Sequence, residues 1–337
     1  MNKSPLVSII ITSYNRSRWL QRAIESALAQ DYSEFEVIIS DNCSTDNSDE
    51  VIRRYTNDSR IKYSRNDTNI GMNANFQKAL NILANGEYIV FLCSDDYFIN
   101  NSFVSQAAEM LFSNPGVSIV WGRNIGIFED NKSKLQYLMP NLNNAIHRKG
   151  IDIILDYMFK PFWLGYGAYM TKSKLINHFE LIVDDIPTNL ELLLDGDAMF
   201  IEKDSYVYRR HNNNAAMNYS FEVIILQMRK ILQVLDTAEI KFPTKKKSLV
   251  NSKNTVIIKT AMSLLNLYAY RNIGGYRKVY SYFEKEFPNL VTQLPVKKRS
   301  IQLKYFVIQI ILSSRKLRKI VSFIFPQKRI FRIEYNN

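Results

Sequence analysis

PLVSIIITSYNRSRWLQRAIESALAQDYSEFEVIISDNCSTDNS, which spans residues 5–48, alternates two hydrophobic periods. Residues 6–11 form a short apolar run rich in β-branched side chains, which predicts a buried strand. Apolar residues then recur three and four apart over residues 19–28, the spacing of a helix, and residues 35–39 predict a second buried strand. Elements in this order are typical of the beginning of a parallel sheet.

The same alternation continues to about residue 121. Helices are expected at residues 46–55, 72–83 and 104–112, and strands at residues 61–63, 88–92 and 117–121. The predicted fold class is therefore α/β, a Rossmann-like and mostly parallel sheet with helices on both faces. In a sheet of this kind, ligands bind beyond the carboxyl ends of the strands.

The second half of the sequence is less regular, and it becomes helical after about residue 219. Short helices are expected at residues 151–159 and 190–194, and strands at residues 162–170, 198–201 and 206–208. Helical spacing of apolar residues then occurs at residues 221–235, 256–270, 276–283 and 301–324. We therefore expect a sheet-containing domain over residues 1–218 and a helical C-terminal region over residues 219–337.

Most of the positive charge lies near the C-terminus. The 337 residues carry a formal net charge of +12. Residues 288–333 contain eleven Lys or Arg and no Asp or Glu, and Glu334 follows them. Residues 1–287 therefore carry only +2. A basic body is typical of nucleic-acid binding, whereas a basic tail favours an anchoring surface, so no nucleic-acid partner is expected.

The sequence favours a reducing compartment. Its two cysteines, Cys43 and Cys93, cannot make a disulfide framework. The apolar run near the N-terminus stops at Ile11, and residues 12–15 offer no cleavage pattern of small residues, so export is not expected. No run reaches the roughly 18 apolar residues of a spanning helix. A cytoplasmic protein is the resulting expectation.

Polar clusters follow three of the predicted strands, at residues 12–15, 40–46 and 93–96. Each cluster alone is typical of Asx turns and helix caps. Because parallel strands end at the same edge of a sheet, the three clusters are expected to meet there. Carboxylate oxygens suit Mg²⁺ and Mn²⁺, and they can also accept hydrogen bonds from a base or a ribose.

Two segments of the chain resemble glycosyltransferase family 2, whose fold is known as GT-A. Residues 5–48 closely resemble the opening of the family, and RNDTNIGMNANFQKALNILANGEYIVFLCSDDYF at residues 65–98 resembles its continuation. The resemblance covers roughly residues 4–125 and resumes at residues 162–174 and 196–214. It implies an inverting enzyme that moves a sugar from a nucleotide-sugar donor to a hydroxyl of a glycan or lipid-linked saccharide, in bacterial surface polysaccharide synthesis.

The resemblance also implies which residues bind the nucleotide. The Tyr14 ring would lie against the base, Asp41 would accept a hydrogen bond from it, and Gly71 would let the backbone approach. The expected nucleotide-binding residues are Thr12, Tyr14, Asp41, Asn69, Gly71, Asn75 and Asp95.

A divalent cation, Mn²⁺ or Mg²⁺, is implied in the same way. Asp96 would bind the cation that bridges the diphosphate, together with Asp95. His211, which follows a Tyr-Arg-Arg segment, would reach the metal or the diphosphate, and a structural role is the alternative. Cys93 stands where the family often has a third acid, and Asn42 replaces a frequent second Asp. Two acids remain, so metal binding is still expected.

Two carboxylates compete for the role of general base. Counting back from Gly196 selects Asp185, with Asp184 beside it as a weaker choice. Glu191 is the second candidate, although it also fits a capping box. Aligning the local leucine pattern instead puts Asn189, which cannot act as a base, in the position of the acid.

The sugar and the acceptor are expected to lie against an aromatic and glycine-rich segment. The residues concerned are Trp163, Gly165, Tyr166 and Gly167. A packed strand that uses its glycines for close contact is the equally good alternative. Arg209 or Arg210 could pair with phosphate oxygens.

The tail at residues 296–333 combines basic clusters with the apolar run at residues 305–314. This combination is typical of an interfacial amphipathic helix, which predicts peripheral binding to the inner face of the cell membrane. The alternatives are a solvated basic helix, a nucleic-acid-binding arm, and packing onto the catalytic domain or a dimer partner. The sequence predicts no particular oligomeric state.

The resulting hypothesis divides residues 1–218 of the catalytic domain into a nucleotide-binding half, residues 1–125, and an acceptor half, residues 126–218. A nucleotidyltransferase is disfavoured because residues 12–18 are not a glycine-rich phosphate loop. A non-catalytic protein of the same fold, which binds a nucleotide-sugar or a glycan, is the remaining alternative.

Overall fold

The structure is a computed structural model. It describes residues 4–128, 136–137, 146–159, 167–176, 185–211, 220–269 and 273–292. The chain divides into two compact units, Met1–Ser252 and Lys253–Asn337, and each is described by itself.

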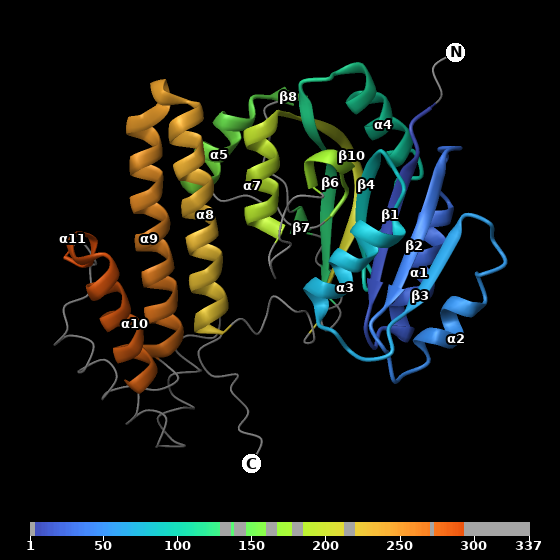
Figure 1. The fold of residues 1–337 in the computed structure, drawn as a ribbon, viewed down its shortest axis with the longest axis horizontal. Helices are drawn as coiled ribbons and strands as arrows, with labels where there is room; N and C mark the ends of the chain where they lie inside the picture. The colour runs from blue at the N-terminus through green and yellow to red at the C-terminus, as the bar shows by residue number, and fades with distance from the viewer. Residues whose placement is uncertain are drawn as a thin grey trace. The chain divides into compact units, whose positions relative to one another are not determined.

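A single sheet runs through the first unit (Figure 1). Its strands follow the order β3-β2-β1-β4-β9-β6-β10-β5, with β7 paired to β6 and β8 paired to β10. The strands are β1 (Val7–Ser13), β2 (Phe35–Asp41), β3 (Ile61–Arg65), β4 (Tyr88–Cys93), β5 (Tyr97–Phe98), β6 (Val117–Phe128), β7 (Gln136–Tyr137), β8 (His147–Arg148), β9 (Tyr169–Lys172) and β10 (Asp197–Arg210).

The four strands β3, β2, β1 and β4 are all parallel. In this register Ser13 lies opposite Asp41, and Thr12 lies opposite Cys93. The carboxyl ends of β1, β2 and β4 therefore meet at one edge, as the sequence predicts. The apolar runs that mark these strands are buried on both faces, which is typical of a parallel sheet covered by helices.

The other half of the sheet is mixed. The strand β9 lies antiparallel between β4 and β6, while β6 and β10 form a long parallel pair. The two strands predicted at residues 198–201 and 206–208 are one strand, β10, with register shifts on both sides of Asp204. The strand predicted at residues 162–170 starts only at Tyr169, and residues 160–166 lie outside the described residues.

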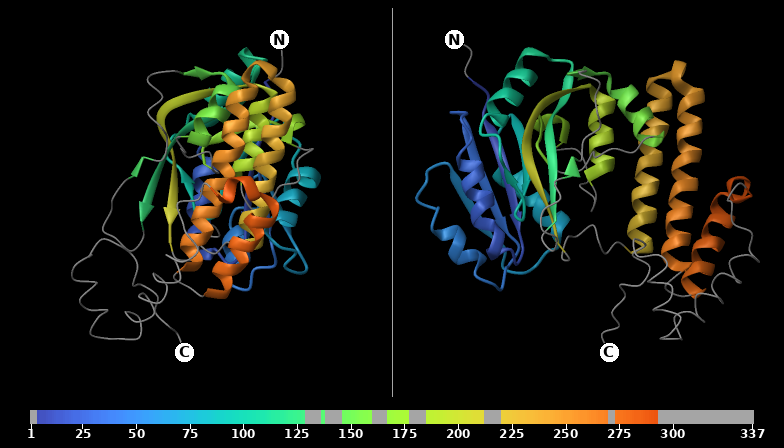
Figure 2. Two further views of the ribbon diagram at one scale, coloured as in Figure 1. Left: turned by 90° about the vertical axis from the view of Figure 1, so that its left-hand side faces the viewer. Right: turned by 180° about the vertical axis from the view of Figure 1, so that it is seen from behind.

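Helices cover both faces of the sheet. On one face, Ile9 and Ile11 of β1 share a buried apolar cluster with α1, α2 and α4. On the other face, Phe76 of α3 packs on Phe91 of β4 with ring centroids 4.5 Å apart. The right-hand view of Figure 2 shows α1 in front of the sheet, and Figure 1 shows α3 on the opposite side. The α/β fold class is confirmed.

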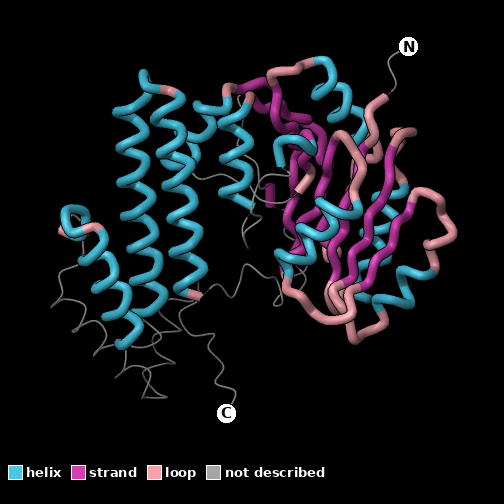
Figure 3. The backbone as a smooth tube through the Cα atoms, in the orientation of Figure 1, coloured by secondary structure: helices cyan, strands magenta, loops and turns pink. Residues whose placement is uncertain are grey.

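Figure 3 colours the helices, the strands and the loops of the chain differently. The helices of the first unit are α1 (Ser17–Leu28), α2 (Ser48–Arg53), α3 (Met72–Lys78) with the π-turn η1 (Ala79–Leu83), α4 (Phe103–Ser113), α5 (Gly150–Phe159), α6 (Ser173–Ile176), α7 (Asp185–Asp195), α8 (Phe221–Lys241) and the short η3 (Pro243–Lys245). The predicted helix at residues 190–194 is thus the second half of a longer helix, α7.

The second unit is helical where it is described. It contains most of α9 (Lys246–Ala269), together with α10 (Ile273–Glu286) and α11 (Pro288–Val291). These helices match the predictions at residues 256–270 and 276–283. The predicted helix at residues 301–324 and the basic tail lie outside the described residues. Among the described helices, none combines the length and the apolar character needed to cross a bilayer.

Candidate active site at the carboxyl edge of the sheet

Asp96 lies at the centre of the site, in the turn that follows β4. Its side chain is buried, with 1% of the residue exposed. The Tyr206 hydroxyl donates to Oδ2 at 2.8 Å, and the backbone N–H of Arg209 donates to Oδ1 at 2.7 Å. Burial and the neighbouring Asp95 carboxylate nevertheless raise the pKa of Asp96 well above its ordinary value. Both donors come from β10, so the two halves of the sheet meet at this carboxylate.

Asp95 is held by a separate set of partners. His211 Nε2 lies 2.8 Å from Asp95 Oδ2, and Arg16 Nε lies 3.7 Å from the same oxygen. The Arg209 side chain donates through Nε to the Asp95 carbonyl oxygen at 2.9 Å. The structure therefore brings together three predicted site residues, Asp95, Asp96 and His211. It adds Arg16 and Tyr206, to which the sequence analysis gave no role.

Cys93 belongs to the same cluster. One ligand atom each from Cys93, Asp95 and Asp96 lie within 4.8 Å of one another. Burial raises the pKa of the Cys93 thiol well above its ordinary value, and the carboxylates of Asp96, Asp95 and Asp185 raise it further. Hard cations such as Mg²⁺ and Mn²⁺ prefer oxygen ligands, so the two carboxylates are the better ligands that this cluster offers.

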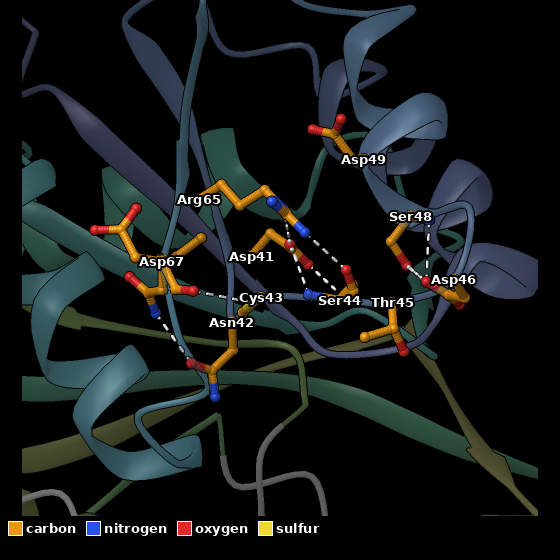
Figure 4. A network of polar contacts seen from close by, with 12 residues as sticks. Asp41, Asn42, Cys43, Ser44, Thr45, Asp46, Ser48, Asp49, Arg65 and Asp67 are labelled. Atoms are coloured by element: carbon orange, nitrogen blue, oxygen red, sulfur yellow. Dashed lines mark hydrogen bonds and ion pairs between the residues drawn. The ribbon is translucent and has the colours of Figure 1, made fainter.

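Asp41 is fully buried at the end of β2, and its carboxylate is engaged within the protein (Figure 4). Oδ2 accepts the backbone N–H of Ser44 at 3.0 Å and lies 3.3 Å from Arg65 Nε. Oδ1 accepts the Ser44 hydroxyl. Asp41 thus fixes the turn that carries residues 42–46. The predicted contact between Asp41 and a base remains a prediction.

The loop before α3 is attached to β2 through amide side chains. Asn42 donates through Nδ2 to Asn69 Oδ1 at 2.8 Å, and its Oδ1 accepts the Ile70 N–H at 3.0 Å. Asn75 is buried and accepts the Ser40 hydroxyl at 2.7 Å, so it fixes α3 against the strand. Gly71 has φ +87°, a conformation that suits glycine.

The loop after β1 contacts the loop after β2. The Asn15 N–H donates to Ser44 Oγ at 2.9 Å, and Asn15 Oδ1 accepts the Thr45 N–H at 2.8 Å. Asn15 adopts φ +53° in this turn. The neighbouring Tyr14 is 42% exposed, so its ring is free to face a ligand, and Thr12 is partly exposed. Hydrogen bonds thus join the two loops that carry Tyr14 and Asn42, while Asp41 and Asn75 lie buried beneath them.

The two candidate bases lie in different surroundings. Asp185 is the first residue of α7, and its charge is close enough to raise the pKa of Cys93. Glu191 lies further along the helix, where burial raises its pKa, the Lys230 ammonium of α8 lowers it and Asp195 raises it. Asn189 is fully buried. Asp185 is thus the candidate next to the acidic cluster, and Asp184 lies outside the described residues.

Only one of the four predicted acceptor residues is described. Gly167 lies just before β9, and a Cβ built there would be 2.6 Å from the amide atoms of Asn124 in β6. The next residue, Ala168, donates its N–H to Asn124 Oδ1 at 3.0 Å. Close packing explains a glycine here, so the structural interpretation fits Gly167. Trp163, Gly165 and Tyr166 lie outside the described residues.

This fold and site define a class: an α/β domain whose acidic pair lies at the carboxyl edge of its sheet, where ligands bind in sheets of this kind. The stretch at residues 8–168 matches the family model described as glycosyl transferase family 2. This stretch of the chain is therefore similar to glycosyltransferase family 2, and the resemblance drawn from the sequence is confirmed.

A related curated protein is the UDP-Glc:alpha-D-GlcNAc-diphosphoundecaprenol beta-1,3-glucosyltransferase WfgD of Escherichia coli. It is 35% identical over 164 residues, which cover 47% of this chain and 63% of the relative. Among the first relatives found, the matched stretch spans between 18% and 63% of the relative's own length. Activity and substrates therefore do not transfer directly.

Two solved structures share the fold. The first is Staphylococcus aureus TarS, residues 1–349, in complex with UDP-GlcNAc, with a TM-score of 0.55 and 19% identity over 83% of this chain and 92% of that chain. The second is the mannosyltransferase PcManGT of Pyrobaculum calidifontis in complex with GDP-Man and Mn²⁺, with a TM-score of 0.53 and 14% identity over 97% of this chain and 89% of that chain. At these identities the likeness concerns the fold alone.

Proposed function

We propose that this chain is an inverting glycosyltransferase that moves a sugar from a nucleotide-sugar donor to a hydroxyl of a glycan or lipid-linked saccharide. The observation that carries the proposal is the placement of Asp95 and Asp96 at the strand edge that the loops after β1 and β2 also border. This edge lies in the stretch that is similar to glycosyltransferase family 2. The relative WfgD is named for a UDP-Glc donor and a diphosphoundecaprenol acceptor, which supports a role in surface polysaccharide synthesis.

The acidic pair fits a divalent cation such as Mn²⁺ or Mg²⁺. Among the described residues no donor contacts Asp95 Oδ1, and each Asp96 oxygen keeps a second lone pair beside its one protein donor. One or two carboxylates together with substrate phosphates are a common environment for Mg²⁺. Negative charge that develops on the departing nucleoside diphosphate would be offset by the bound cation.

Asp185 is the general base in this proposal. It accepts the proton of the acceptor hydroxyl while that oxygen attacks the anomeric carbon from the face opposite the diphosphate, which inverts the centre. Its burial at 8% exposure and its proximity to the acidic cluster support the assignment. Glu191 instead lies where the Lys230 ammonium lowers its pKa, on a part of α7 that no contact links to the acidic cluster among the described residues.

Thermal unfolding with UDP, CDP, GDP and dTDP, each with and without Mn²⁺, tests donor binding. A ligand at about 100 times its Kd adds about 2.7 kcal/mol of stability, which gives a clear shift. We expect one nucleotide to shift the midpoint only with metal, and we expect Asp96→Asn to abolish the shift. Folded protein that responds to no nucleotide would contradict the proposal and favour the non-catalytic alternative.

The base assignment is tested by comparing Asp185→Asn with Glu191→Gln. Loss of a general base costs roughly 10²–10⁴-fold in rate, so Asp185→Asn should lower kcat by that factor while the donor still binds. Glu191→Gln should change stability more than kcat. A large loss of kcat in Glu191→Gln together with near-normal turnover in Asp185→Asn would reverse the two roles.

We also propose that the basic tail binds the inner face of the membrane. Eleven basic residues between 288 and 333 support this, since Lys and Arg near an anionic surface contribute about 1 kcal/mol each. A membrane location agrees with a lipid-linked acceptor such as the one for which WfgD is named.

A further inference from the structure

Trp19, on the first turns of α1, contacts the side chains that hold Asp95. Its ring stacks on His211 with centroids 4.5 Å apart and an interplanar angle of 19°. The Arg16 guanidinium carbon lies 5.8 Å from the centre of the same ring. His211 and Arg16 are the two residues whose nitrogens face Asp95 Oδ2, at 2.8 and 3.7 Å. One aromatic side chain therefore touches both partners of this carboxylate.

The backbone that carries Trp19 is held in a different way from the backbone that carries His211. The neighbours of Trp19 on α1, Leu20 and Ala23, are fully buried in the core cluster, so the helix is firmly anchored. His211 instead directly follows Arg210, the last residue of β10. Its side chain is only 4% exposed, and stacking on Trp19 restricts the rotation of the ring.

We propose that Trp19 is a positioning residue that keeps the Asp95 carboxylate in one orientation, through His211 and Arg16, for the binding of a divalent cation. The inference rests on the proposed function, in which Asp95 is part of the metal site. Partners of metal ligands act in this way generally, because they fix the direction in which a ligand presents its oxygens.

The test measures Mn²⁺ binding directly. Purified full-length protein is titrated with Mn²⁺, alone and with the nucleoside diphosphate chosen by the thermal panel, and unbound Mn²⁺ is followed by its electron paramagnetic resonance signal. The variants are Trp19→Leu and Trp19→Phe. The matched control on the same helix is Gln21→Ala, whose side chain bonds the exposed Glu25 at 3.0 Å.

We expect Trp19→Leu to weaken Mn²⁺ binding about tenfold, the lower end of the range for residues behind a metal ligand. Trp19→Phe keeps an aromatic face for His211 and should bind almost as tightly as the wild type. Gln21→Ala should bind like the wild type. If Trp19→Leu does not fold, Trp19→Met replaces it with the same expectation.

Each outcome has a distinct meaning. Equal Mn²⁺ affinity in the wild type and Trp19→Leu would overturn the inference while leaving the proposed function intact. Equal loss in Trp19→Phe and Trp19→Leu would overturn it as well, because ring stacking would then not be the cause. A wild-type protein that binds no Mn²⁺ would instead contradict the metal site of the proposed function.

Discussion

Glu36 in β2 and Asp96 in the turn after β4 are both buried carboxylates, yet their pKa values move in opposite directions. At Asp96, burial and Asp95 dominate, and the pKa rises. At Glu36, burial also acts to raise the pKa, but donors from Lys62, Ser8 and Asn85 outweigh it and lower the value. The difference has a simple cause, since Glu36 has a cation and two further donors, whereas Asp96 has a second carboxylate beside it.

Glu36 therefore stabilises the fold in a pH-dependent way. Its pKa is lower in the folded than in the unfolded chain, so its contribution is complete above the unfolded value of about 4.3 and is lost as pH falls through the folded value. We expect Glu36→Gln to lower the free energy of unfolding by about 1–3 kcal/mol at pH 7. Urea unfolding at several pH values checks this, and a difference that does not shrink in acid would contradict it.

Tyr206 is predicted to support the acidic pair. Its hydroxyl donates to Asp96 and accepts the Cys93 N–H at 3.4 Å, so Tyr206→Phe leaves buried groups without a partner. We expect a loss of about 1–3 kcal/mol and weaker metal-dependent nucleotide binding. Tyr55→Phe is the matched control, because its hydroxyl bonds Glu25 at the exposed surface. Equal stability of the two variants in thermal unfolding would contradict the prediction.

At the scale of an element, the loop between β3 and α3 depends on one glycine. Gly71 has φ +87° and ψ 158°, a region open essentially to glycine alone, and a Cβ there would meet nothing within 4 Å. The cost of Gly71→Ala is therefore one of backbone strain, about 1–3 kcal/mol. Nucleotide affinity should fall as well, because the loop must move.

Gly116→Ala provides the comparison. Gly116 also has open space around its Cβ position, but it lacks a positive φ. We expect Gly116→Ala to unfold at almost the same denaturant concentration as the wild type and to bind nucleotide normally. If both alanine variants lost the same stability, strain at Gly71 would not be the explanation.

In this chain the local sequence pattern predicts the helices and strands well, but it predicts poorly which strands pair in the sheet. The runs at β1, β2 and β4 are mostly apolar because both faces are covered, so they could be recognised without any partner. The insertion of β9 between β4 and β6 depends on contacts about 80 residues apart in sequence, such as Tyr88 with Lys172. Nothing within a short window carries that information.

The same limit applies to the candidate site. Asp95 and Asp96 were predictable because they follow a strand directly and match a family motif. The sequence pattern places Tyr206 in a strand but gives its hydroxyl no role, because its partner, Asp96, lies 110 residues away. The only sequence signal for Arg16 was weak, namely that it is a basic residue beside the polar loop after β1. Trp19 could not be distinguished from an apolar residue that packs an ordinary helix against the core.

For the whole molecule, the charge distribution predicts how the protein associates with membranes. Residues 1–292 carry +2 of the total +12, so a chain that ends at residue 292 loses most of the basic charge. We expect the full chain to sediment with vesicles that contain anionic lipid, and less so as salt shortens the Debye length. The shortened chain should stay in solution and still bind nucleotide. Sedimentation of both chains with neutral vesicles would contradict an electrostatic tail.

The order of synthesis determines when the hydrogen bonds from β10 to Asp96 can form. Tyr206 leaves the ribosome 110 residues after Asp96, and His211 follows Asp95 by 116. At about 5–20 residues per second, this is a delay of roughly 5–20 s. During that interval the nascent chain already holds every residue expected to bind nucleotide, but Asp96 lacks Tyr206 and Asp95 lacks His211. The acidic pair thus reaches its final arrangement only when β10, the strand that completes the sheet, has been translated.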